Sequence, residues 1–538
     1  MTSPVSSGTS SPDTAARNDW LGLIAIALGV TLVVIDFTIV NVIVPPIVTD
    51  LSIDSISAQW IQESYAIVLA ALLLVAGKVA DIVGARRMFL TGTAVFAAAS
   101  LAAALAPSGV VLIAGRSAQG VGGALIMPAS LALLNSMFTG EARAKAFAVW
   151  GSVIGGGAAL GPLLGGLLGE ISWRWAFGIN LVVAAAVVIG IILYVEEADR
   201  SARGIDLWSA VLVSGGTALV AFGVIEGRHY GWWTSVGADG PGIGALSPVP
   251  LALALSATAL VAFVARQRVL ADSGREPLMD LSLFQIKSFS GGNCATVVIG
   301  LAEFGILAVL PLWLQFALGY SVFQAGATVA VMAVGAFVAS GASFSLLGRF
   351  TPLGLVRIGL ILEGLGVLAL GLVASPSTSG IVICATLLLY GVGVGFATAQ
   401  VTNVVLADVP SDRAGVGSGI QGTARQLGSA LGIAALTTLF FTSLSSGTTN
   451  RLAERGIADP GGAISDAVSD SAGGAIAALD ASAAIGAAGA AREAMSHSVT
   501  LTGYACAALL GLGTLTTLLI PRRRQAPAPT LKPGPEML

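Results

Sequence analysis

Long apolar runs, separated by short polar stretches, fill most of this 538-residue chain. A helix needs about 20 mostly apolar residues to cross a bilayer, and fourteen runs reach that length. The runs at 206–226 and 248–266 are the least distinct. The pattern predicts an all-α polytopic membrane protein with spans at 20–44, 59–79, 88–106, 109–136, 145–168, 175–195, 206–226, 248–266, 289–315, 323–347, 353–373, 379–404, 417–443 and 500–520.

The composition supports a membrane protein and argues against several other classes. Only 10% of the residues are charged, against roughly 25% in soluble domains. The net charge of −3 gives no basic face for nucleic acid. Cys294, Cys384 and Cys506 have unrelated spacings, and His229 and His497 are expected in loops. We therefore expect no disulfide framework, no metal site and no cofactor.

The distribution of basic residues predicts the orientation. Cytoplasmic loops of membrane proteins are enriched in Lys and Arg. With a cytoplasmic N-terminus, 20 of the 26 Lys and Arg residues, Arg425 among them, lie in inward segments, and five lie outside. The remaining one, Arg116, falls within the fourth span. Both termini are therefore predicted to be cytoplasmic, in the plasma membrane.

An internal similarity predicts the domain organisation. "QGVGGALIMPASLALL" (119–134) aligns without gaps to "YGVGVGFATAQVTNVV" (390–405). Two six-helix halves related in this way, with substrate bound between them, form a transporter architecture. The predicted parts are a disordered tail at 1–19, a six-helix bundle at 20–200, two inserted helices at 201–270, a second bundle at 271–520 and a tail at 521–538.

The region 444–499 differs from the other connections in length. It is rich in Ala and Gly, with scattered charged and hydroxyl residues. We expect a flexible external connection with some helix. A role in gating substrate has no support in the residues.

The fifth span contains "GGGAALGPLLGG" (155–166), although Gly and Pro are poor helix formers. Gly157, Gly161, Gly165 and Gly169 recur at intervals of four and therefore line one side of the helix. Such a stripe allows another backbone to approach closely, and Pro162 is expected to bend the helix. Packing alone explains the stripe, and a gate is the alternative.

Several motifs in order resemble the fourteen-helix drug:proton antiporter branch of the major facilitator superfamily. The loop "GKVADIVGARR" (77–87) resembles motif A of that superfamily, although charged turns at a membrane surface have the same composition. Ile82 and Ala85 stand where the family usually has Arg, and the corresponding loop "GRFTPLG" (348–354) lacks the acid. The motif A residues are Gly77, Asp81, Gly84, Arg86 and Arg87.

Five further segments carry the same resemblance over residues 20–520. "RSAQGVGGA" (116–124) is similar to motif B, and "DFTIVNVIVP" (36–45) to the first-helix motif of the branch. "WRWAFGIN" (173–180) and "PLMDLSLF" (277–284) also resemble it. The antiporter motif C is matched by Gly157, Gly161, Pro162, Gly165 and Gly166. The resemblance implies that this stripe lies between the two halves and closes the outer side of the inward-open state.

Ionisable residues within the spans are functional candidates, because charge in hydrocarbon is costly. Asp36, Glu303 and Glu363 could each bind a proton or a cationic substrate, and pairing between spans is the structural alternative. Arg116 keeps its proton, so its role would be electrostatic, with Gln119 as a relay. Asp206 and Glu226 lie at the two ends of the seventh span and are expected at the membrane–water interface.

The sequence thus predicts a secondary exporter, and the resemblance implies proton antiport, by alternating access, of amphipathic drugs or toxic compounds, cations among them. Its partners would be a small-molecule substrate, protons and the bilayer, and it would act as a monomer. A dedicated exporter of one metabolite, antibiotic or lipid is the first alternative. A membrane enzyme or receptor is the second, but no catalytic cluster, sensory domain or GxxxxGK[ST] phosphate loop is present in the sequence.

Overall fold

The computed structural model describes residues 12–520 except 54, 198–203, 228–229, 235–246, 276, 348, 411–412, 472 and 482–484. Fourteen long helices match the fourteen predicted runs. Thirteen of them contain a described segment apolar enough to cross a membrane, and α5 is the fourteenth. They are α1 (Pro12–Leu51), α2 (Ser55–Val83), α3 (Ala85–Ala104), α4 (Gly109–Met137), α5 (Gly140–Ile171), α6 (Trp173–Tyr194), α7 (Leu207–Glu226), α8 (Pro248–Asp272), α9 (Lys287–Leu312), α10 (Val322–Leu346), α11 (Pro352–Val373), α12 (Gly380–Leu406), α13 (Ala414–Glu454) and α16 (Ile485–Leu518).

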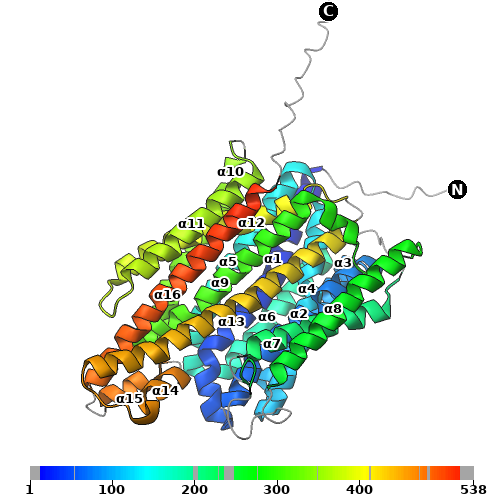
Figure 1. Cartoon of the computed structure of the whole chain (residues 1–538). Helices are drawn as coiled ribbons and strands as arrows, with labels where there is room; N and C mark the ends of the chain where they lie inside the picture. The colour runs from blue at the N-terminus through cyan, green and yellow to red at the C-terminus, as the bar shows by residue number, and fades with distance from the viewer. Residues whose placement is uncertain are drawn as a thin grey trace, which may run out of the picture.

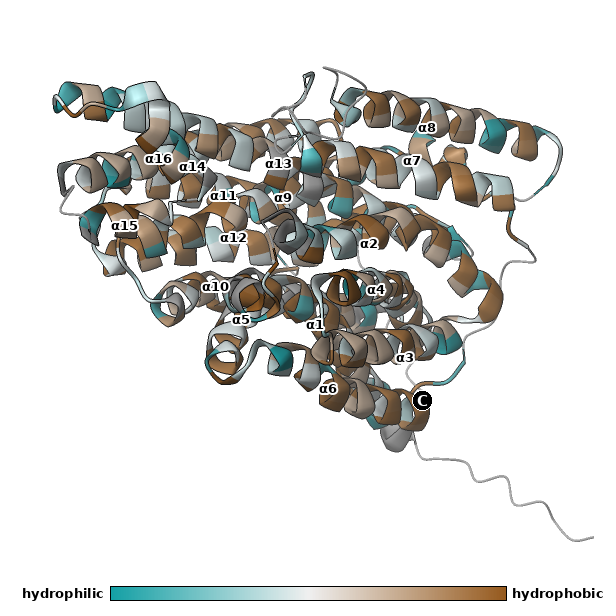
Figure 2. Cartoon of the chain, turned by 90° about the horizontal axis from the view of Figure 1, so that it is seen from below, coloured by the Kyte–Doolittle hydropathy of each residue, from teal (hydrophilic) through white to brown (hydrophobic). Residues whose placement is uncertain are grey.

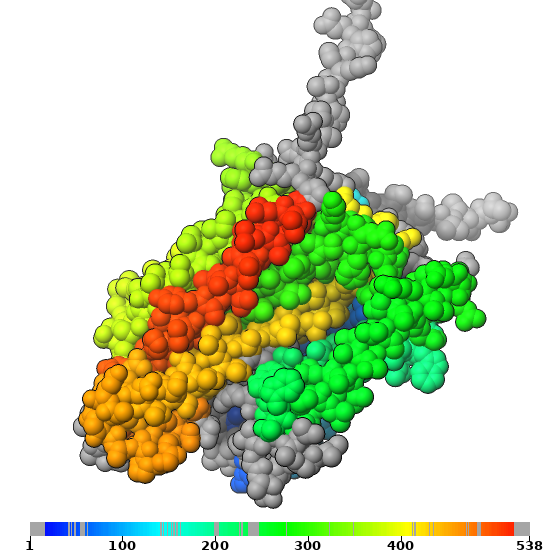
Figure 3. Space-filling view, viewed as in Figure 1, coloured from blue at the N-terminus to red at the C-terminus, as the bar shows by residue number. Residues whose placement is uncertain are grey.

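The helices pack into two groups, which we call the N-terminal group (α1–α6) and the C-terminal group (α9–α13 and α16) (Figure 1). Helices α7 and α8 pack on each other at one edge of the bundle, where α7 contacts α2 and α13 (Figure 2). In the space-filling view α13 and α16 run beside each other across one face, and α7 and α8 lie on the other side of α13 (Figure 3). The fold is therefore an all-helical bundle suited to a membrane.

Several close contacts between the two groups lie toward the end of the bundle where α2 ends and α13 begins, and α5 also packs on α10. A Cβ added to Gly419 would lie 3.6 Å from the Cα of Gly77, so the two backbones are close. On α5, a Cβ at Gly151 would lie 3.2 Å from the Cα of Ala399 on α12. The ammonium of Lys145 lies 4.6 Å from the ring centroid of Phe344. The groups are thus joined at the end that the basic residues predict to be cytoplasmic.

Much of the region 444–499 is helical. Helix α13 continues to Glu454, α16 begins at Ile485, and α14 (Ala463–Asp470) and α15 (Ala475–Ala481) lie between them. A small core of Leu452, Ala487 and Ala490 holds these elements together. The expectation of a flexible connection therefore understated the order of this region. Alanine, which is frequent here, is the best helix former.

Candidate functional site

Asp36 is the centre of a buried polar network in the N-terminal group. It lies on α1, and neither it nor Arg116 on α4 is exposed. Arg116 Nη1 donates to Asp36 Oδ2. Asp36 Oδ1 accepts from Gln119 Nε2 at 2.9 Å and from Asn180 Nδ2 at 2.6 Å. The carboxylate thus accepts from three donors, one of them positively charged, which offset the cost of burying it.

The surrounding side chains fix the position of Arg116. Its Nε donates to the carbonyl of Ile61 on α2 at 3.0 Å. Its guanidinium lies 4.4 Å from the ring centroid of Tyr65, whose hydroxyl donates to the carbonyl of Val33 at 3.2 Å. Gln119 also donates to Ser100 Oγ on α3 at 2.8 Å. Five helices therefore hold one ion pair.

Asn180 was not among the sequence candidates, although the structure places it directly on Asp36. It is 2% exposed and also donates to Ser100 Oγ at 3.2 Å. The available signal was a lone Asn in the apolar α6, at the end of "WRWAFGIN". An amide in such a position needs a partner, but the sequence does not show which one.

Glu303 forms the corresponding ion pair of the C-terminal group. Arg425 Nη2 donates to Glu303 Oε2 at 2.7 Å, and the two side chains are 11% and 1% exposed. Counting Arg425 among the inward surface residues was wrong, because it lies inside α13 and is largely buried. The predicted span 417–443 already included Arg425, and the structure places it about three turns into α13, which begins at Ala414.

Glu363 lies on α11 and has no hydrogen-bond partner. It is 0% exposed, and neither carboxyl oxygen is hydrogen bonded. Its charged neighbours are Glu303 and Arg425. The hydroxyl of Tyr390 on α12 is buried nearby and also lacks a partner. Glu363 is therefore a buried carboxyl group that no described residue hydrogen bonds.

The two buried clusters approach each other across the interface between the groups. Phe37 follows Asp36 on α1, and Phe304 follows Glu303 on α9. Their ring centroids are 6.0 Å apart. Phe37 also contacts Tyr65, which packs on Arg116. Packed rings therefore connect Arg116 of the N-terminal group to Phe304 of the C-terminal group.

The glycine stripe of α5 faces α1 and not the C-terminal group. A Cβ at Gly161 would lie 1.9 Å from Thr38 Oγ1 and 3.0 Å from the carbonyl of Ile35. A Cβ at Gly157 or Gly169 would likewise meet side chains of α1. The inference that this stripe lies between the halves was therefore wrong. Helix α5 meets α10 and α12 along another side, and the spacing alone did not show which neighbour the glycines meet.

The motif A residues join α2 to α3 at a tight turn. Gly84 has φ +104°, which L side chains rarely adopt. Arg86 Nη2 donates to the carbonyl of Ile192 at 3.0 Å, and Arg87 lies 3.3 Å from Glu197. Glu197, after α6, was not a candidate. The loop is thus tied to the end of α6, while Gly77 and Asp81 lie on the last turns of α2.

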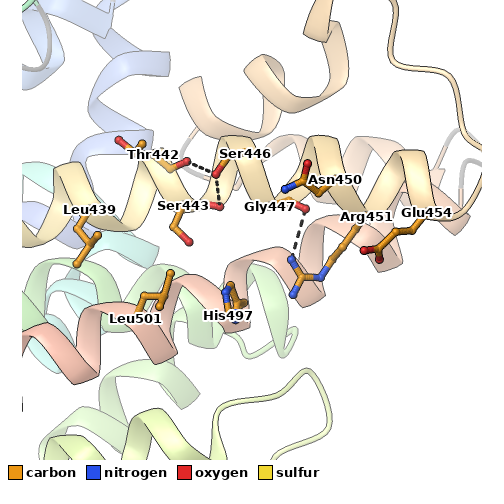
Figure 4. A pocket seen from close by; sticks show the side chains of 10 residues that line it. All are labelled: Leu439, Thr442, Ser443, Ser446, Gly447, Asn450, Arg451, Glu454, His497 and Leu501. Carbon is orange, nitrogen blue, oxygen red and sulfur yellow. Dashed lines mark hydrogen bonds between the residues drawn. The ribbon is translucent and has the colours of Figure 1, made fainter.

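The described residues also form a cavity of about 410 Å³ between α13 and α16. Figure 4 shows Ser446, Arg451 and His497 among the side chains that line it. His497 therefore lies in a helix and not in a loop. None of the candidate residues lines this cavity. Glu226 ends α7, as predicted, and its side chain is 1% exposed.

The apolar helices and the buried ion pairs define a polytopic membrane protein, and the family of transporters that it matches makes it a transporter and not an enzyme. The profile described as Major Facilitator Superfamily matches residues 26–433. The chain belongs to the major facilitator superfamily.

Similar proteins agree with this assignment. The chain is 32% identical to the multidrug resistance protein Stp of Mycobacterium tuberculosis, over 82% of this chain and 80% of that protein. It is also 32% identical to the probable actinorhodin transporter of Streptomyces coelicolor, over 83% of this chain and 76% of that protein. The solved structure of the proton:xylose symporter XylE superposes with a TM-score of 0.59 at 13% identity, over 94% and 96% of the two chains, and shows the fold alone.

Proposed function

We propose that the chain exports amphipathic, cationic compounds from the cell in exchange for protons, by alternating access between the two helix groups. It would lie in the plasma membrane with both termini in the cytoplasm. The relatives named as multidrug resistance and antibiotic transport proteins support the substrate class. The proton as driving ion rests on the buried acids.

The observation that carries the proposal is the presence of buried ionisable residues in both groups. Asp36 pairs with Arg116, and Glu303 with Arg425. A buried charge costs several kcal/mol or more unless it is paired, so such residues are kept for a function by default. When such a carboxylate separates from its arginine and binds a proton instead, proton binding is linked to the change of conformation.

The contacts between the groups support alternating access. Backbones of the two groups come close toward the predicted cytoplasmic end, where α2 meets α13 and α5 meets α12, and α5 also packs on α10. Opening that end requires these close backbone contacts to separate. The motif A turn at Gly84 lies at the same end and connects α2 to α3, so its movement would accompany the opening.

Everted membrane vesicles test the proposal. We expect ethidium, an amphipathic cation, to accumulate in vesicles containing the protein when the interior is acidic. The accumulation should collapse when nigericin removes the pH gradient. Uptake that a sodium gradient drives and a pH gradient does not would contradict proton exchange. Uptake that is the same with and without either gradient would contradict it as well. Vesicles from cells without the protein provide the baseline.

A dedicated exporter of one product is the second candidate, and one similar protein favours it. The relative from Streptomyces coelicolor is named as a probable transporter of a single compound, actinorhodin. The same vesicles separate the two possibilities. A dedicated exporter would transport one compound from a panel of unrelated amphipathic cations, and a multidrug exporter would transport several.

A further inference from the structure

The cavity between α13 and α16 leads from apolar to charged surroundings (Figure 4). Most of its lining comes from α13, at positions that recur every three or four residues and therefore share one face of that helix. Leu439 of α13 and Leu501 of α16 fall within the apolar runs of the two helices, whereas Ser446 to Glu454 follow the end of the run on α13. The cavity therefore crosses the predicted surface of the membrane, at the end of the bundle opposite the start of α13.

The shape of this lining indicates the kind of molecule that fits. Leu439 and Glu454 are about 22 Å apart along the helix axis, at 1.5 Å per residue. Hydroxyl groups of Ser443 and Ser446 lie between the apolar end and the charged end. A molecule that fills the whole cavity needs an apolar part toward the bilayer and a polar part toward water. The phospholipids that surround a membrane protein have this form.

Two charged side chains in the cavity have opposite signs and weak or absent partners. Arg451 Nη1 donates to the carbonyl of Gly447 at a long 3.4 Å, and its Nε lies 3.8 Å from Glu493. Glu493 has a closer partner in Arg455, at 2.8 Å. The carboxylate of Glu454 forms no ion pair or hydrogen bond among the described residues. The cavity thus offers one cation and one anion to a ligand.

The neighbouring charges do not alter this balance. Arg492 Nη1 donates to Asp480 Oδ1 at 3.2 Å, so these two neutralise each other, as Arg455 and Glu493 do. An anionic headgroup would face Glu454 with a like charge, and a cationic ligand would face Arg451 in the same way. A headgroup that carries one charge of each sign complements both residues.

We propose that this cavity binds a zwitterionic phospholipid whose headgroup carries a phosphate and a primary ammonium, as in phosphatidylethanolamine. The phosphate accepts from the guanidinium of Arg451, the side chain best suited to phosphate oxygens, and from the amide of Asn450. The ammonium donates to Glu454. The acyl chains pass Leu439 and Leu501 into the bilayer. This site is independent of the compound that the protein exports.

Native mass spectrometry of the delipidated protein in detergent tests the site. Three lipids with the same acyl chains are titrated: phosphatidylethanolamine, phosphatidylglycerol, which has no ammonium, and phosphatidylcholine, whose ammonium has no N–H donor. We expect the wild type to bind one phosphatidylethanolamine more tightly than either of the others. Equal affinity for the three lipids would overturn the proposal.

Two charge variants test the named contacts. Arg451→Gln and Glu454→Gln should each weaken the binding of phosphatidylethanolamine by about five-fold, the size of a good exposed ion pair. Glu454→Gln should not weaken the binding of phosphatidylglycerol. Arg349→Gln and Glu170→Gln make the same changes at exposed residues outside the cavity and should bind as the wild type does. Cavity variants that also bind as the wild type does would refute the site.

Two further measurements separate a lipid from other occupants. Ser446 is exposed, so Ser446→Trp should keep the unfolding temperature of the lipid-free protein, fill the cavity and weaken lipid binding with every charge in place. Unchanged binding in this variant would place the lipid elsewhere. Glycerophosphoethanolamine, the headgroup without acyl chains, should not displace the lipid at equal concentration. Displacement would show that the cavity takes a soluble zwitterion and would overturn the lipid assignment.

Discussion

Two glycines on the same helix provide the sharpest test of how α5 meets α1. A Cβ at Gly161 would lie 1.9 Å from Thr38 Oγ1, 2.9 Å from Thr38 Cβ and 3.0 Å from the carbonyl of Ile35. A Cβ at Gly156 would meet nothing within 4 Å. Gly156→Ala and Gly161→Ala therefore add the same methyl group to the same helix, one into open space and one into a close contact.

The structure sets the expected size of the difference. Either substitution gains about 1 kcal/mol of helix propensity, which cancels in the comparison. At Gly161 the methyl group forces apart α1 and α5, and such overpacking costs about 1–3 kcal/mol. Thr38 must also leave the position in which it donates to the carbonyls of Val34 and Ile35. We expect Gly156→Ala to be neutral or stabilising and Gly161→Ala to be less stable than Gly156→Ala by about 1–3 kcal/mol.

Thermal unfolding of the purified variants in detergent measures this difference, with transport in vesicles as a second readout. Thr38 lies two residues after Asp36 on α1, so the displaced helix also disturbs the ion pair. Ethidium export should therefore fall in Gly161→Ala and persist in Gly156→Ala. Equal unfolding temperatures for the two variants would refute the close packing of the stripe on α1.

Three further predictions follow from particular contacts. Arg116→Gln leaves the Asp36 carboxylate buried without its cation and should lower the free energy of unfolding by about 3–5 kcal/mol. The double variant Asp36→Asn/Arg116→Gln should regain stability, and a double variant no more stable than Arg116→Gln would contradict the pairing. Gly84→Ala forces an L side chain into φ +104° and against Glu197, so the unfolding temperature should fall well below that of Gly204→Ala, where a Cβ meets nothing within 4 Å. The hydrogen bonds from Arg266 hold the pKa of Asp206 below its usual range. Asp206→Asn should therefore lower the unfolding temperature at pH 7, and the difference from the wild type should shrink as the pH falls below about 4. A difference in unfolding temperature that stays constant with pH would argue against the ion pair.

The helices could be predicted from the sequence because the bilayer imposes a length on every span. The fourteen predicted runs correspond to the fourteen long helices, and the ends differ most where α13 and α16 continue beyond the apolar runs. Asp36, Arg116 and Gln119 were found together because buried charge is rare and each lies in an apolar run.

The partners were harder to predict, because they depend on how the helices are rotated. Asn180 reaches Asp36 from a helix that lies 144 positions further along the chain. Arg425 appeared to be a surface residue because the start of α13 is polar. The glycine stripe showed that some helix comes close, and only the packing shows that this helix is α1.

If protons drive export through the buried acid of α1, two Asp→Asn variants on that helix must behave differently. Asp36→Asn and Asp50→Asn make the same change on the same helix. Asp36 is buried, whereas the side chain of Asp50 is 47% exposed. With equal amounts of protein in everted vesicles, the account predicts that an acidic interior drives ethidium uptake in the wild type and in Asp50→Asn but not in Asp36→Asn. Uptake by Asp36→Asn at the wild-type rate, driven by the same pH gradient, would contradict it.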